Sequence, residues 1–280
     1  MGRISRGWAL TKQSWSVLKS DRSLVVFPAL STVFAILALL AIWVPAALVT
    51  GVFETEAFDE HNPVYYIAVA VSAYVSTFIA IFFNVALADC AARSLRGEDT
   101  SVSEGLSAAG RLIGPILAWT FVAATVGLVL RLIEDRVPAA GKIATWIAGA
   151  AWAIATFFVV PVIALEGGGP WQSLKRSAAV VKARWGEGAF GTFSITAFTV
   201  WAIMAIVLVT AVGCVGLAAL GIPPLALAVG ALGVIAVIVV SVISSALNGI
   251  FRVAVYQYAV SGEAPSGYDS KLVQNAFTRS

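Results

Sequence analysis

The chain has 280 residues, of which 60% are hydrophobic and only 12% are charged, and its formal net charge is +3. A soluble domain has roughly half its residues apolar and about a quarter charged, so this composition excludes a water-soluble fold and indicates an integral membrane protein. The positive balance does not indicate nucleic-acid binding, because basic residues of membrane proteins gather in the cytoplasmic loops.

Residues 1–22 predict an amphipathic leader helix lying on the membrane surface. One apolar stripe runs along it, formed by Ile4, Trp8, Thr11, Trp15 and Leu18. Lys12 and Lys19 flank the stripe, and their long stems can reach past apolar surface to water. The first apolar run begins near Ser23 and is too long for the core of a signal peptide, so we expect it to be retained as a span.

Long uncharged runs predict an all-α membrane protein with six transmembrane helices in three hairpins. The predicted spans are residues 23–49, 64–88, 112–133, 143–165, 189–212 and 225–250. The last two come from the 64 residues between Glu187 and Arg252, which include no charged residue and no histidine. We expect the turn between them to be made by Gly213, Gly216, Gly221 and Pro223-Pro224.

Three further amphipathic helices are predicted in the connections and the tail. Ser101 and Glu104 have the spacing of a capping box, which predicts a short helix starting there. After the glycine hinge at 167–169, a helix over 170–185 is predicted to carry Trp171, Leu174, Ala178, Val181 and Trp185 on one face. Its other sides hold Lys175, Arg176, Lys182 and Arg184. The tail, 252–280, has a second capping spacing at Ser266 and Asp269.

The distribution of Lys and Arg predicts the orientation in the membrane. Fifteen of the 18 lie in the leader, in the connections after spans two and four, or in the tail. Only Arg131, Arg136 and Lys142 lie on the other side. Short positively charged loops resist translocation, so we expect both termini, and all four amphipathic helices, on the cytoplasmic side of the plasma membrane.

Short matches between the connections indicate an internal repeat of an inward span, a small-residue turn and an amphipathic helix. Three segments also resemble a bacterial and archaeal family of six-span membrane proteins known only as a domain of unknown function. They are residues 6–19, 82–110 and 161–188. The layout is similar to the membrane domain fused to some glycerophosphoryl diester phosphodiesterases. The resemblance implies architecture alone, and no catalytic residue follows from it.

Candidate chemistry is sparse in this sequence. The acidic loop with Glu54, Glu56, Asp59, Glu60 and His61 could hold a divalent cation, but a solvated outer loop is the favoured interpretation. Phosphate-loop and metalloprotease motifs are absent. We therefore predict no catalytic residue, no metal and no cofactor. Cys90 and Cys214 are placed at opposite membrane surfaces and are not expected to form a disulfide.

Five polar residues lie at the inner ends of spans two, four and six: Asn84, Asp89, Glu166, Asn248 and Arg252. Structural caps and interhelical hydrogen bonds are the favoured interpretation, because charge is tolerated at the headgroup level. The alternative is an inward-facing cavity at which Asp89 and Glu166 pair with Arg252. Such a cavity would favour a transporter or flippase-like protein, especially with spans broken at Pro45, Pro115 or Pro161.

The leading expectation is a non-enzymatic membrane protein that organises lipids or partner proteins at the cytoplasmic face. Membrane lipids with anionic headgroups, and a membrane-protein partner or a homo-oligomer, are the expected partners. The headgroup contacts are assigned to basic side chains of the surface helices: Lys12, Lys19, Lys175, Arg176, Lys182 and Arg184. Simple anchoring at the interface is the plainer alternative for the same residues.

Overall fold

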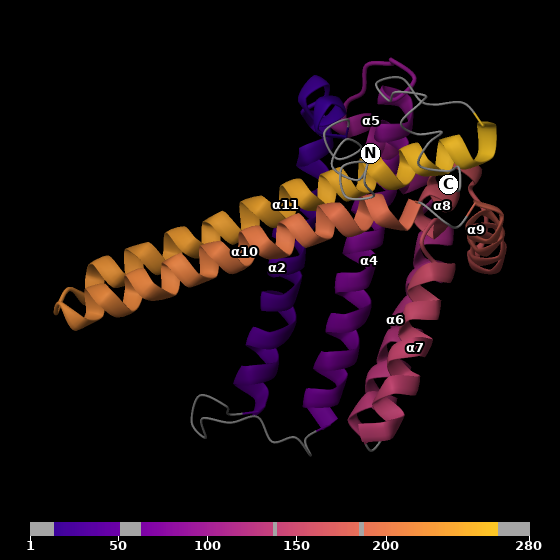
Figure 1. The fold of residues 1–280 in the computed structure, drawn as a ribbon. Helices are drawn as coiled ribbons and strands as arrows, with labels where there is room; N and C mark the ends of the chain where they lie inside the picture. Colours follow the sequence, from indigo (N-terminus) through magenta and orange to yellow (C-terminus); the bar gives the residue numbers. More distant parts are fainter. Residues whose placement is uncertain (1–13, 51–62, 137–138, 185–187, 263–280) are drawn as a thin grey trace.

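The computed structural model describes residues 14–50, 63–136, 139–184 and 188–262 (Figure 1). Within these ranges every regular element is a helix, in agreement with the predicted all-α class. The helices are α2 (Ser23–Thr50), α4 (Pro63–Ser94), α5 (Val102–Arg111), α6 (Ile113–Arg136), α7 (Ala139–Ala155), α8 (Val159–Glu166), α9 (Pro170–Arg184), α10 (Gly188–Ala219) and α11 (Pro223–Ser261). Residues 14–20 of the leader are also helical.

Six helical segments of the described chain are long and apolar enough to cross a membrane. They are Ser23–Thr50, Pro63–Ser94, Ile113–Glu134, Gly141–Glu166, Ile195–Ala219 and Pro223–Ser261. The fourth combines α7 and α8. Each of the six overlaps one predicted span, but α11 has 39 residues and reaches about 58 Å at 1.5 Å per residue, nearly twice a bilayer core.

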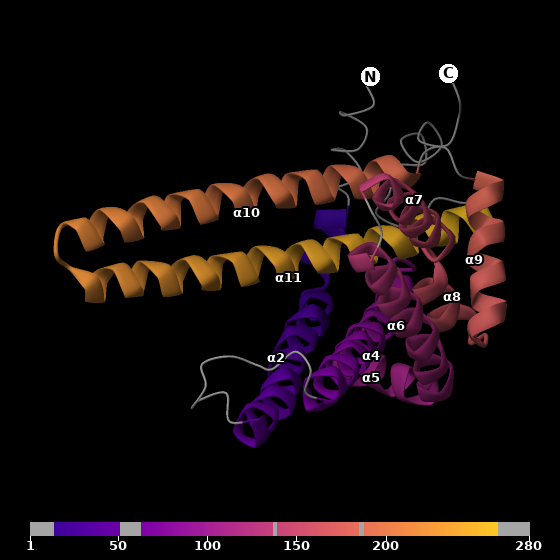
Figure 2. The same cartoon turned by 90° about the horizontal axis from the view of Figure 1, so that it is seen from below.

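The helices form a bundle with a projecting arm. Helices α2, α4, α6 and α7 run alongside one another, whereas α10 and α11 lie across them and extend away as a pair (Figures 1 and 2). Only the C-terminal part of α11 packs on the bundle, where it contacts α2, α4, α8 and α9. The last hairpin of the sequence therefore crosses the first four spans.

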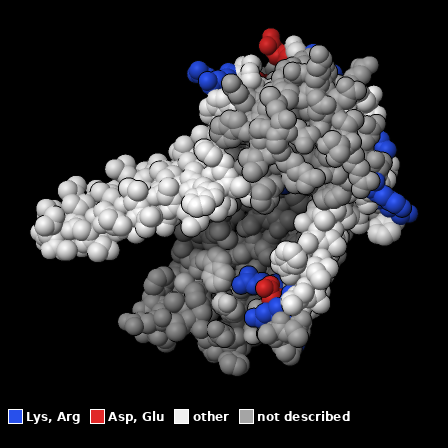
Figure 3. Space-filling view, in the orientation of Figure 1, with Lys and Arg blue, Asp and Glu red and all other residues white. Residues whose placement is uncertain are grey.

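The arm, the projecting part of α10 and α11 within residues 195–240, exposes large apolar side chains and contains no charged residue. Trp201, Val209 and Leu227 are 73%, 71% and 76% exposed, and the face in Figure 3 shows neither acidic nor basic residues on it. An exposed apolar surface of this extent marks contact with lipid or protein. The arm therefore has the surface of a membrane-inserted hairpin.

The predicted turn between the last two spans is shorter in the structure. It consists of Leu220, Gly221 and Ile222, with Gly221 at φ +74°. Gly213 and Gly216 lie inside α10 instead, so assigning them to the turn was wrong. At Gly213 a Cβ would lie 3.3 Å from Cγ1 of Val229, so this glycine allows α10 and α11 to approach closely.

The core lies where α4, α8 and α11 cross. Leu87, Ile163 and Phe251, one from each helix, are almost completely buried. Gly249 lies against Leu87 so closely that a Cβ on the glycine would stand 2.2 Å from Cδ2 of the leucine. The packing is therefore tightest toward the end of the bundle where α4 and α8 terminate.

We call this end of the bundle the charged end, defined by Asp21, Arg93, Glu98, Glu166 and Arg176. Glycines with positive φ mark the helix ends there: Gly97 after α4, Gly167 after α8 and Gly262 after α11, at +82°, +69° and +76°. A left-handed residue at these positions satisfies the last carbonyl groups of a helix and turns the chain away from its axis.

Candidate functional site

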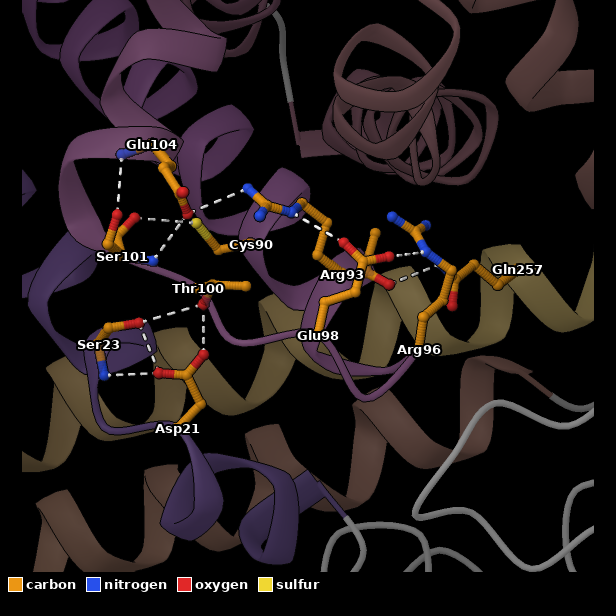
Figure 4. A network of polar contacts seen from close by, with 11 residues as sticks. Asp21, Ser23, Cys90, Arg93, Arg96, Glu98, Thr100, Ser101, Glu104 and Gln257 are labelled. Carbon is orange, nitrogen blue, oxygen red and sulfur yellow. Dashed lines mark hydrogen bonds and ion pairs between the residues drawn. The ribbon is translucent and has the colours of Figure 1, made fainter.

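A polar network joins the leader, α2, α4 and α5 at the charged end (Figure 4). The Asp21 carboxylate accepts hydrogen bonds from the backbone N–H of Ser23 at 3.0 Å and from the Thr100 hydroxyl. Ser101 caps α5 and exchanges hydrogen bonds with Glu104, which confirms the predicted capping box. The short helix α5 is therefore fixed at its first turn.

The same network includes an ion-pair cluster. Arg93 donates from Nε to Glu98 at 3.1 Å and from Nη1 to Glu104 at 3.2 Å. Arg96 Nε lies 2.7 Å from the other oxygen of Glu98. These hydrogen bonds, first that of Arg96 and then that of Arg93, lower the pKa of the Glu98 carboxyl. The group is exposed, so the cluster orders the turn after α4 and adds little stability.

Glu166 anchors a second group of contacts at the end of α8. Its Oε1 accepts from Arg176 Nε of α9 at 3.0 Å and from the hydroxyl of Tyr256 on α11. Tyr256 is only 3% exposed, so its hydroxyl needs a partner inside the protein. The hydrogen bonds to Glu166, and then Tyr256, raise the pKa of Arg176. These contacts of Glu166 join α8, α9 and α11.

Span four is interrupted between α7 and α8. The break covers residues 156–158, just before Pro161, whose ring cannot supply the N–H that a continuous helix needs. The backbone N–H of Phe158 donates instead to the buried hydroxyl of Ser177, on α9, at 3.0 Å. Pro45 lies within continuous helix and Pro115 in the first turn of α6. Of the three prolines, only Pro161 accompanies a broken span.

The five predicted polar residues do not converge into one cluster. Asn84 and Asn248 donate to carbonyl groups of their own helices, those of Ala80 at 2.7 Å and Ser244 at 3.0 Å. Asp89 is half-buried on α4, and the positive charges that act on it are Arg93, Arg111 and Arg96. The two asparagines thus bond within their helices and not between spans.

Arg252 lies apart from both carboxylates proposed for it. Its guanidinium Cζ stands 5.1 Å from the centroid of the Phe157 ring, and its buried Nε has no hydrogen-bond partner in the described structure. Glu166 is occupied by Arg176 and Tyr256. The alternative arrangement, in which Asp89 and Glu166 pair with Arg252, is not formed among the described residues, where α9 delivers a different arginine to Glu166.

A Trp–Lys pair recurs on the leader and on α9. Lys19 Nζ lies 5.8 Å from the Trp15 ring, and Lys175 Nζ lies 5.2 Å from the Trp171 ring. Both lysines follow their tryptophan by four residues, in Trp-Ser-Val-Leu-Lys and Trp-Gln-Ser-Leu-Lys. Such spacing puts the cation over the ring on a helix surface. The four-residue spacing of both pairs is present in the sequence, although the apolar stripes alone do not indicate it.

The predicted apolar faces of these two helices are divided between buried and exposed side chains in the structure. On α9 the side chains against the bundle are Ser173, Ser177, Val180 and Val181, whereas Trp171 is 67% exposed. In the leader, Val17 and Leu18 are buried and Trp15 is 39% exposed. The tryptophans therefore point away from the protein, because small serines allow the helices to pack closely.

The other predicted headgroup residues are only partly described. Lys182 is exposed on α9, and Arg176 is half-buried beside Glu166. Lys12 lies outside the described residues, and of Arg184 the structure describes the backbone in α9 alone. Three further parts of the sequence also lie outside the described residues: the acidic loop with His61, the residue Glu187, and the predicted tail helix. Among the residues that are described, no three His, Cys, Asp or Glu side chains group as metal ligands.

A partly open cavity of about 250 Å³ lies between α2, α4 and α11. Its lining is rich in hydroxyl groups and includes one of the predicted polar residues: Pro28, Ser31, Thr32, Ala80, Phe83, Asn84, Ser241, Val242 and Ser245. A water molecule takes about 30 Å³, so there is room for several. Cys90 and Cys214, both free as predicted, are not among the lining residues.

Six apolar helical segments and a charged end with exposed Trp–Lys pairs define a helical integral membrane protein. Residues 64–267 match the Family of unknown function (DUF6159), and the chain belongs to that family. The matched range runs from α4 to beyond the end of α11 and includes the cavity wall formed by α4 and α11. No curated protein and no solved structure matches the chain.

Proposed function

We propose that this protein is a non-enzymatic membrane protein that organises anionic lipids, or partner proteins, at the cytoplasmic face of the plasma membrane. The observation that carries the proposal is the pair of exposed Trp–Lys contacts, Trp15–Lys19 and Trp171–Lys175. Tryptophan favours the headgroup level of a bilayer, and each lysine near an anionic surface contributes on the order of 1 kcal/mol.

The proposed orientation follows from the excess of Lys and Arg on one side of the spans. It places the charged end, the leader and α9 at the inner leaflet. A second copy of the chain, or another membrane protein, would meet the exposed apolar arm. The similarity to the membrane domain of glycerophosphoryl diester phosphodiesterases remains part of this proposal and supplies no activity.

Native mass spectrometry tests the proposal on the purified protein in mixed phosphatidylglycerol and phosphatidylcholine. We expect the wild type to retain mostly phosphatidylglycerol. The variant Lys19→Gln/Lys175→Gln/Lys182→Gln should lose that preference by about fivefold per lysine, as roughly 1 kcal/mol each implies. The matched control removes the three basic residues of the opposite side, Arg131, Arg136 and Lys142. Equal retention of both lipids by the wild type would contradict the proposal.

The hydroxyl-lined cavity favours a second candidate, a transporter or flippase-like protein. Four hydroxyl side chains and Asn84 line one space between three helices, which is the arrangement that a polar solute would need. The broken span at Pro161 does not line this cavity, so the support is the cavity alone. If a solute passes through this cavity, Ser245→Cys should react with small water-soluble thiol reagents in membrane vesicles. Val239→Cys, on the lipid-facing surface of the arm, should not react. An unreactive Ser245→Cys would argue for a closed structural void.

A further inference from the structure

Arg252 holds a positive charge inside the helix crossing without a counter-charge. Its Nε is fully buried and has no hydrogen-bond partner among the described residues. The residue as a whole is half-buried. An uncompensated cation in such a place is strongly unfavourable unless an anion binds it.

Four described carboxylates of the charged end have other partners, and the positive charges that act on Asp89 are Arg93, Arg111 and Arg96. Glu166 binds Arg176 and Tyr256. Glu98 and Glu104 bind Arg93, and Asp21 binds Thr100. No ion pair joins Arg252 to any of the carboxylates that the structure describes. Within the described residues Arg252 therefore has no carboxylate partner, so its site is open to an anion from another molecule.

The shape of the site suits a phosphate group. The Phe157 ring, 5.1 Å from Cζ, covers one face of the guanidinium and limits how it can turn. A guanidinium is a planar fork of N–H donors, which matches two oxygens of a phosphate better than any single-point cation would. Phe157 belongs to the break before Pro161, so the interrupted span helps to shape the site.

We propose that Arg252 binds the phosphate of an anionic membrane lipid. Arg252 is the first charged residue after the 64-residue uncharged run, and its neighbours Phe251 and Val253 are buried apolar side chains. A lipid reaches this place laterally and brings acyl chains that match the apolar surroundings. A zwitterionic headgroup would bring its own cation beside the guanidinium, so an anionic headgroup is favoured. This assignment deepens the proposed lipid-organising function and rests on it.

The test measures thermal unfolding of the full chain in detergent while phosphatidylglycerol or phosphatidylcholine is added. For Arg252→Gln we expect about tenfold or more weaker phosphatidylglycerol binding, because charge-assisted hydrogen bonds to the phosphate are lost. Arg252→Lys keeps the charge without the fork and should fall between wild type and Arg252→Gln. Arg131→Gln, which removes an exposed charge on α6, should bind like the wild type.

Each outcome decides the assignment. Unchanged phosphatidylglycerol binding in Arg252→Gln would overturn it. If Arg252→Gln does not fold, unchanged binding in Arg252→Lys would overturn it instead. Inorganic phosphate reproducing the lipid effect in phosphatidylcholine would identify a soluble anion and overturn the lipid assignment. If Arg252→Gln binds normally while the triple lysine variant does not, the proposed function survives and this site fails. The reverse result assigns the lipid to Arg252 and not to the surface helices.

Discussion

At the residue scale, the most sensitive positions are glycines that allow helices to touch. Gly105 on α5 is the clearest, because a Cβ there would lie 2.6 Å from Cζ of Phe27 and 2.7 Å from Sγ of Cys90. Phe27 and Cys90 are fully buried and cannot move aside without displacing α2 or α4. Gly110 on the same helix has nothing within 4 Å of the equivalent point.

Gly105→Ala should therefore lower stability by about 1–3 kcal/mol, the usual effect of overpacking a filled core. Gly110→Ala is the matched control and should be neutral or stabilising, because alanine favours a helix by up to about 1 kcal/mol over glycine. Thermal unfolding in detergent measures both. Equal melting temperatures for the two variants would show that α5 is not packed as described.

Tyr256→Phe removes the hydroxyl that donates to Glu166 and keeps the ring against Phe158. We expect a loss of roughly 1–3 kcal/mol, the usual range for a hydrogen bond to a charged group. Tyr74→Phe is a suitable control, because its hydroxyl makes only a long 3.5 Å contact with the Leu117 carbonyl. A Tyr256→Phe variant as stable as Tyr74→Phe would show that the three helices are joined by packing alone.

At the element scale, the positions of helix ends followed from local chemistry. The capping box at Ser101, and the glycine hinge beginning at Gly167, were both readable from a few neighbouring residues. The packed face of α9 was not. Apolar periodicity predicted a membrane-interface face that carries the tryptophans, but lipid and protein both attract apolar residues, so an apolar stripe does not show which side meets the protein.

The break in span four depends on a contact between elements and can be tested. Ser177→Ala leaves the backbone N–H of Phe158 buried without its partner, which should cost about 1–3 kcal/mol. Ser107→Ala, at an exposed position of α5, is the control and should have no effect. Differential scanning fluorimetry compares the two. Unchanged melting of Ser177→Ala would mean that water or a shifted backbone satisfies the amide.

At the scale of the whole molecule, the open question is how the bundle is oriented in the membrane. The proposed orientation puts Lys175 inside the cell and Lys142 outside. A membrane-impermeant maleimide should then label Lys142→Cys in intact cells and leave Lys175→Cys unlabelled until the membrane is opened. Both positions are exposed in the structure, and the native chain, with Cys90 and Cys214 alone, gives the background. Labelling of Lys175→Cys from outside would contradict the proposed orientation and favour the opposite one.

The sequence by itself determined the class of protein, the six apolar spans and the ends of several helices. These depend on composition and on interactions between residues a few positions apart. Tertiary structure decided the crossing of α11 over the bundle, the partner of Glu166 and the isolation of Arg252. The physical reason is that Arg176 and Arg252 carry the same charge, so charge alone does not show which of them pairs with Glu166. The chain turns at Gly167 and returns as α9, and this path places Arg176 beside Glu166.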